Sequence, residues 1–96
     1  MKARLVLRRR TVLPDGAILE ARIWIVPSPV PPSTHSLKYS LFYGYPGVRL
    51  VGYDNERGKG DHKHIGEVEH RYSFVSIEQL LADFLADVAA ERGSLP

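Results

Sequence analysis

Two histidines and a lysine gather in one short segment of the chain, and their spacing suits acid–base chemistry on a phosphate. His62 and His64 are separated by a single residue. If this stretch is extended, both imidazoles point to the same side, so two groups that titrate near neutrality converge at one place. Gly58 and Gly60 flank Lys59, which favours a tight turn that presents backbone amides and an ammonium group to an anion.

Cleavage of RNA without a metal needs this combination of groups. A base removes the proton of the 2′-hydroxyl, an acid protonates the leaving 5′ oxygen, and cations stabilise the charge on the phosphorane. We predict that His62 and His64 are the acid and the base. The other catalytic candidates are two lysines that would bind phosphate, two aspartates that would orient an imidazole, and a reserve histidine: Lys59, Lys63, Asp54, Asp61 and His70.

Two alternatives exist for the same residues. The His-x-His spacing also occurs in metal sites, where Asp61, Glu67 or His70 would complete the ligand set. We rank a metal lower because nearby lysines oppose a cation, and we predict neither a metal nor a cofactor. The plainer alternative is that the histidines are surface residues and the glycines only shape a loop. The clustering of three of the four histidines within residues 62–70 argues against it.

Positive charge is concentrated in the first half of the chain. Residues 1–52 contain eight basic and two acidic residues, whereas residues 76–96 contain one basic and four acidic residues. The basic half is suited to attract a polyanion such as RNA. The residues that we expect to bind nucleic acid are Arg8, Arg9, Arg10, Arg57 and Lys59. The alternative is that these charges only keep the domain soluble, because the formal net charge is +2.

The composition excludes several classes of protein. The chain has no cysteine, which excludes disulfides, thiolate metal sites and a cysteine nucleophile. No apolar run is long enough to span a membrane, and the first residues do not have the pattern of a secretory signal. We therefore expect a cytoplasmic protein without membrane contacts, and the length of 96 residues predicts one domain over residues 1–96.

Alternating apolar and polar residues predict two β-hairpins. The first joins residues 3–13 and 17–26 through a turn at Pro14-Asp15-Gly16, and the second joins residues 37–45 and 48–54 through Pro46-Gly47. Four prolines within residues 27–32 make a stiff connector between the hairpins. Residues 55–66 are rich in glycine and charge and are expected to form a loop, and residues 72–75 a short strand.

Residues 76–92 are expected to form a helix. Ser76 and Gln79 have the spacing of a capping box, and Gly93 is a typical helix terminator. Apolar residues recur between them every three or four positions, so one face of the helix can pack on a sheet. The predicted fold is α+β, an antiparallel sheet of two hairpins plus a short strand, packed against one C-terminal helix. Unpaired edge strands leave room for a homodimer.

The chain also resembles a known family. The resemblance is carried by four motifs, which are LPDG at residues 13–16, the proline connector followed by Ser33-Thr34-His35, YDNERGKGDHKHIGE at residues 53–67, and LLADF at residues 80–84. In these motifs the chain resembles the TumE-type toxins of prokaryotic toxin–antitoxin pairs, over nearly its whole length. The segment at residues 53–67 is the most specific of the four.

The resemblance implies the toxin of a type II toxin–antitoxin pair, encoded beside a helix-turn-helix antitoxin that binds and silences it. Together with the chemistry of residues 54–70, it leads us to expect a metal-independent endoribonuclease that acts on RNA. Two other functions fit the same sequence. One is a non-catalytic inhibitor that binds nucleic acid or a protein, and the other is a metal-dependent nuclease.

Overall fold

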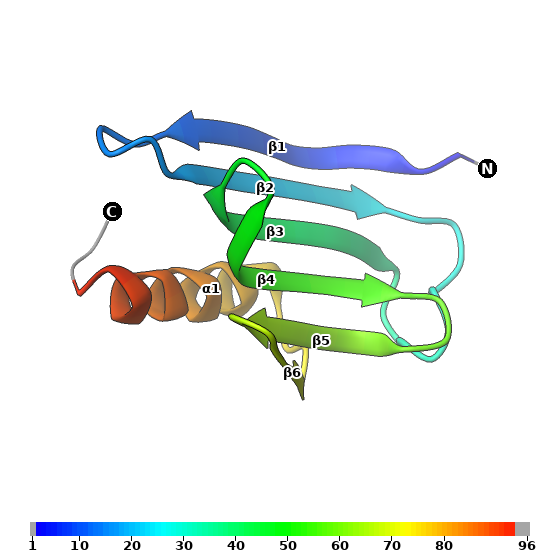
Figure 1. Ribbon diagram of the computed structural model, residues 1–96. Coiled ribbons are helices and arrows are strands. Elements are labelled where there is room, and N and C mark those ends of the chain that lie inside the picture. Colours follow the sequence, from blue (N-terminus) through cyan, green and yellow to red (C-terminus); the bar gives the residue numbers. More distant parts are fainter. Residues whose placement is uncertain (1, 94–96) are drawn as a thin grey trace.

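The computed structural model describes residues 2–93 and contains an antiparallel sheet with one helix across it (Figure 1). The elements are β1 (Arg4–Val12), β2 (Ile18–Ile25), β3 (Leu37–Tyr45), β4 (Val48–Glu56), β5 (Gly60–Ile65), β6 (Val68–Arg71) and α1 (Ile77–Arg92). Each strand pairs with the next one in sequence, so the order across the sheet is β1-β2-β3-β4-β5-β6. The predicted α+β class, with a C-terminal helix on an antiparallel sheet, is confirmed.

The core lies between α1 and the middle strands, because apolar side chains alternate along β3 and β4 as the two-residue period requires. Its buried members on the sheet are Ile23, Tyr39, Leu41, Tyr43, Val51 and Tyr53, and those on the helix are Leu80, Phe84 and Val88. The opposite face of the sheet is not covered by any helix within residues 2–93. We call it the open face.

Both ends of α1 are as predicted. The Ser76 side chain accepts a hydrogen bond of 3.1 Å from the Gln79 amide, and Gly93 ends the helix with φ of 79°. Arg92 in the last turn donates to the Tyr43 hydroxyl (2.9 Å) and to Asp15 (3.0 Å), which joins the helix to the β1–β2 turn. Within residues 2–93, the helix falls short of the length and hydropathy required to cross a membrane.

One glycine of the second hairpin is required by close packing. The β3–β4 register shifts between Tyr43 and Gly44. A Cβ atom at Gly44 would lie 2.0 Å from the carbonyl oxygen of Val48, which is backbone and cannot move aside as a side chain would. A larger residue at this position would therefore disturb the bulge itself.

Two predictions were wrong in the region after β4. Residues 55–66 are not a loop, because β4 continues to Glu56, a turn occupies residues 57–59, and β5 follows. Gly58 and Gly60 adopt φ of 88° and 76° and make this reversal possible. The expected strand at residues 72–75 is replaced by the earlier β6. The glycines and charged residues of this segment indicated a loop. In the structure they form a tight turn and the strand β5, which is polar on both faces.

Candidate active site

The β4–β5 hairpin separates the residues of the segment YDNERGKGDHKHIGE onto two faces of the sheet. Cross-strand partners lie on the same face, and successive residues of a strand lie on opposite faces. The open face therefore carries Asp54, its partner His62, and His64. The face toward α1 carries Asn55, its partner Asp61, and Lys63. The chemical groups that the sequence places together thus form two separate clusters.

His62 is held rigidly on the open face. Its side chain is almost fully buried, with 3% of the residue exposed. Nδ1 lies 2.9 Å from the carbonyl oxygen of Gly60, and because a carbonyl only accepts, Nδ1 is the donor. Nε2 lies 2.5 Å from Oδ1 of Asp54. Neither of these two facing atoms has an aligned hydrogen bond to any other group among residues 2–93, so each is left to pair with the other.

His64 is the second imidazole of the cluster. Its ring centroid lies 5.1 Å from that of His62, and the two rings meet edge to face at 81°. Desolvation lowers the pKa of His64 below its usual 6.5, and the positive charges of Arg49 and His62 lower it further. Arg49 lies across Gly52, where a Cβ atom would come within 2.6 Å of its side chain. The lowered pKa favours the neutral form of the His64 imidazole.

A shallow depression of about 360 Å³ adjoins the cluster. Its lining residues come from the β4–β5 turn, β5 and β6: Lys59, His62, Glu69, His70 and Arg71. Lys59 Nζ lies 3.6 Å from Glu69, whose carboxylate also lies 3.7 Å from Nε2 of His62. Lys59 thus lies near His62, whereas His70 pairs with Lys63 and therefore lies on the other face of the sheet, although it also lines the depression.

Asp61 belongs to the other face and does not contact His62 or His64. It accepts hydrogen bonds from Ser33, from His35 Nε2 (2.7 Å) and from the Tyr39 hydroxyl (2.7 Å). Burial alone would raise the pKa of Asp61, but these three donors outweigh burial and hold the pKa below 3.8. The imidazole that Asp61 orients is that of His35, which also packs on Phe74 with a centroid distance of 4.1 Å.

Asn55 extends the same network toward the connector. Its fully buried side chain accepts a hydrogen bond of 3.0 Å from the amide of Tyr39 and donates one of 2.8 Å to the carbonyl oxygen of Leu37. Asn55 and Asp61 therefore fasten the proline connector and the start of β3 to the β4–β5 hairpin. This half of the segment builds structure and supports the cluster of Asp54, His62 and His64 on the other face.

Lys63 also points away from the two histidines. Its Nζ lies 3.1 Å from Asp87 of α1 and 3.5 Å from the hydroxyl of Tyr53. The Tyr53 hydroxyl donates to the same carboxylate. Lys63 therefore helps to fasten the helix to the sheet, and the phosphate-binding role that we predicted for it has no support in its position.

Three of the four predicted arginines can be placed by the strand register. Arg8 pairs with Arg22 and Arg10 with Glu20, so these side chains lie on the open face. Arg9 lies on the face toward α1. Arg57 is exposed in the β4–β5 turn, outside the strands.

The open face contains a row of register partners that crosses the whole sheet. From β1 to β6 the row consists of Arg8, Arg22, Ser40, Asp54, His62 and Arg71. At the usual strand spacing it is about 24 Å long. Four residues near the cluster or in this row were not predicted as site residues from the sequence: Arg22, Arg49, Glu69 and Arg71. The even spacing of Arg22 with Glu20 and Trp24 on one face of β2 was the available signal, but only the register connects it to His62.

The same cluster offers ligands for a metal ion. Asp54, His62 and His64 each present one ligand atom, and these atoms all lie within 4.8 Å of one another. Two imidazoles and a carboxylate suit Zn²⁺ or another transition ion. The third ligand in this set is Asp54, whereas the sequence suggested Asp61, Glu67 or His70 for that position.

Comparison with known proteins identified a family. A family model described as toxin TumE matches residues 1–92, which include the whole sheet and α1. No curated protein and no solved structure matches the chain. The family match therefore covers both faces of the β4–β5 hairpin and the whole row of register partners from β1 to β6.

Proposed function

The chain belongs to the TumE family of toxins, and we propose that it is an endoribonuclease whose active site is the cluster of Asp54, His62 and His64. Membership of the family makes it the toxin of a toxin–antitoxin system, with an antitoxin as its partner. The proposal of RNA cleavage depends mainly on one observation. The ring centroids of two imidazoles lie 5.1 Å apart, and these rings share the open face with the carboxylate of Asp54 and with Arg8, Arg10 and Arg22.

His64 is the general base of this proposal. Its lowered pKa favours the neutral ring, which is the state needed to take the proton of a 2′-hydroxyl. Arg49 contributes to this shift through its charge. The same arginine lies beside the ring, where it can also contact a phosphate oxygen.

His62 and Asp54 together are the general acid. Nδ1 of His62 is committed to Gly60, so the proton available for transfer is the one between Nε2 and the carboxylate of Asp54. The Asp54 side chain is 23% exposed, whereas that of His62 is 4% exposed. In this scheme the pair gives this proton to the leaving 5′ oxygen, which leaves His62 neutral and Asp54 as a carboxylate.

Cations around the depression stabilise the developing negative charge. Lys59 and Arg71 line it beside His62, and positive groups placed near a phosphorane lower the barrier to its formation. Glu69, which pairs with Lys59, keeps that lysine near the cluster when no RNA is bound. In this scheme Lys63 has no part in catalysis.

The RNA strand would follow the open face along the row from Arg8 toward Arg71. Backbone phosphates are bound by arginines without reading sequence, and a row about 24 Å long spans several nucleotides. Phe42 and Trp24 lie on the same face and offer aromatic surfaces for stacking of bases. A single-stranded substrate fits this surface because stacking needs unpaired bases.

Alanine substitution of the two histidines tests the proposal. His64→Ala and His62→Ala should each abolish growth arrest in cells and cleavage of RNA by the purified protein. His35→Ala is the matched control, because it removes an imidazole from the other face of the sheet. His64→Ala should unfold at the same denaturant concentration as the unmodified protein, since His64 is only partly buried. Full toxicity of folded His64→Ala at normal expression would refute the proposal.

A metal-dependent nuclease is the second candidate, and the ligand set of Asp54, His62 and His64 supports it. A metal bound there would supply a Lewis acid for the scissile phosphate. EDTA separates the two mechanisms. Cleavage that persists after dialysis against EDTA supports acid–base catalysis, and cleavage that stops and returns with Zn²⁺ or Mn²⁺ supports the metal.

A non-catalytic inhibitor remains the third candidate. It would act stoichiometrically on its target, and Arg8 and Arg10 would matter more for toxicity than the histidines. Multiple turnover of a labelled RNA by a small molar fraction of toxin would exclude it.

A further inference from the structure

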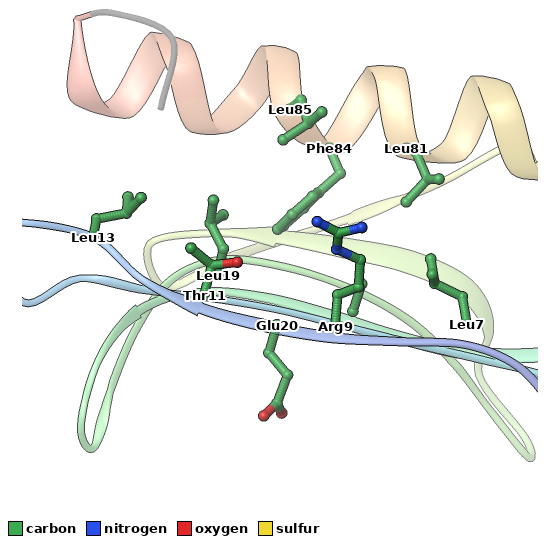
Figure 2. A pocket seen from close by; sticks show the side chains of 10 residues that line it. Leu7, Arg9, Thr11, Leu13, Leu19, Glu20, Leu81, Phe84 and Leu85 are labelled. Atoms are coloured by element: carbon green, nitrogen blue, oxygen red, sulfur yellow. The ribbon is translucent and has the colours of Figure 1, made fainter.

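An apolar groove lies on the face of the sheet toward α1, beside the helix. It has a volume of about 520 Å³. Figure 2 shows Leu81, Phe84 and Leu85 of α1 on one side and Leu7, Leu13 and Leu19 of the β1–β2 region on the other. Leu85 is 41% exposed. The groove lies on the opposite face from His62 and His64, so it is separate from the proposed active site.

The groove exists because one helix is too narrow for six strands. The sheet is about 24 Å wide from β1 to β6, whereas a helix with its side chains is about 10–12 Å in diameter. Since α1 packs against β4, the residues of β1 on this face stay partly or fully exposed, whereas Ile23 of β2 is buried in the core. Apolar sheet faces are normally covered by a second layer. The free width beside α1 matches one further helix.

Arg9 places a positive charge in the lining of the groove, which favours an acidic residue on the molecule that binds there. Its guanidinium projects from β1 toward the helix (Figure 2). Within residues 2–93 it makes no ion pair, in contrast to Arg10 and Arg22, which both pair with Glu20 on the open face. A positive charge among leucines is best satisfied by a carboxylate on the molecule that covers them.

We infer that this groove binds an amphipathic helix of the antitoxin, with an acidic residue of that helix paired to Arg9. The helix would lie beside α1 and complete the second layer of the fold. The family supplies the partner, the apolar lining and the free width favour a helix, and the exposed, unpaired Arg9 would be buried by that helix and then favours an acid opposite it. The inference does not depend on the proposal of RNA cleavage.

The position of the groove also explains how binding there would silence the toxin. Arg8 and Arg10 lie on the same strand as Arg9 but on the open face. An antitoxin bound at Arg9 therefore lies at the β1 edge of the sheet, next to Arg8, where the row of register partners begins. The bulk of the partner would then close the path of the RNA without contact to His64.

Two neighbouring arginines provide a matched pair of variants. Arg9→Glu and Arg8→Glu make the same change of charge one residue apart, on opposite faces of an exposed strand. Both are made in the His64→Ala background, and their affinity for the purified antitoxin encoded beside the toxin gene is measured by titration calorimetry. We expect Arg9→Glu to weaken binding by about tenfold or more, as loss of a central interface charge does, and Arg8→Glu to bind within about twofold of the unmodified background.

Leu85→Asp is the second variant, because an exposed leucine can be replaced without loss of the fold. It should also weaken antitoxin binding by about tenfold or more, and circular dichroism should show unchanged helix content. In cells, Arg9→Glu in the active protein should arrest growth even when the antitoxin is co-expressed. An Asp or Glu to Arg change in the antitoxin helix should restore binding to Arg9→Glu.

Three results would overturn the inference. The first is antitoxin binding by both Arg9→Glu and Leu85→Asp at the unmodified affinity. The second is an equal loss of affinity in Arg8→Glu, which would place the antitoxin on the open face. The third is a toxin that is dimeric on its own in light scattering and becomes monomeric in Leu85→Asp, which would make a second copy the occupant of the groove.

Discussion

Two aspartates on opposite faces of one hairpin should respond differently to the same isosteric substitution. Asp61 accepts three hydrogen bonds and its side chain is 10% exposed. In Asp61→Asn, the amide can keep three partners, since Ser33 can accept instead of donate. What is lost is the charge. Hydrogen bonds to charged groups contribute about 1 kcal/mol more than neutral ones, so three bonds correspond to about 3 kcal/mol of stability.

The loss should depend on pH in a defined direction. The pKa of Asp61 in the folded protein is below its usual 3.8, so its contribution to stability is complete above that value and disappears as the pH falls through the folded pKa. The difference in unfolding free energy between the unmodified protein and Asp61→Asn should be constant from about pH 5 to 8 and should shrink below about pH 3.8.

Urea denaturation monitored by circular dichroism measures this difference, with His64→Ala as the background so that cells tolerate expression. Asp54→Asn is the control. It should lower stability by only about 1 kcal/mol, because an asparagine of the same shape can still face Nε2 of His62. In the active background it should abolish toxicity. The reasoning is refuted if Asp61→Asn is as stable as the background, or if the difference between them is the same at pH 3 as at pH 7.

Three further predictions concern other parts of the molecule. The rate of RNA cleavage should fall as the pH is lowered through a pKa below 6.5, because His64 acts as the neutral base. A pH–rate profile whose acidic limb has its midpoint well above pH 6.5 would exclude His64 from that role. Lys63→Met should leave toxicity intact and lower stability by about 1 kcal/mol or less, since the ion pair with Asp87 is partly exposed; loss of cleavage by the folded variant would return Lys63 to the active site. Gly44→Ala should destabilise by about 3 kcal/mol or more, because its Cβ would meet a backbone oxygen; thermal unfolding checks this, and an unchanged midpoint would contradict the close contact.

Local rules predicted much of the fold. The turn at Pro14-Asp15-Gly16, the alternation along residues 37–45 and the cap at Ser76 each depend on neighbours in sequence, and all three regions fold as expected. The same rules failed at residues 55–66. Glycine and charge there are typical of a loop, but this part of the sheet has polar surroundings on both faces, so its strand carries no apolar alternation.

The candidate site was predictable only in part, for a related physical reason. Extended geometry at residues 62–64 correctly placed the two imidazoles on one side. It did not show which acid lies beside them, because the pairing of Asp54 with His62 depends on the position of the β4–β5 turn. The separation of Asp61 and Lys63 from the histidines follows from the same register. Arg22 and Arg71 come from strands distant in sequence, and no local pattern connects them.

The order of the strands has a consequence for how the chain folds during synthesis. Every strand pairs with its predecessor, so each hairpin can form as it leaves the ribosome. Contacts between residues that are close in sequence favour fast folding. The bond between Arg92 and Asp15 joins groups 77 residues apart and can form only when the helix has emerged. A nascent chain can therefore align its two imidazoles early, but its core closes only after Leu80, Phe84 and Val88 of α1 have emerged and pack on the sheet.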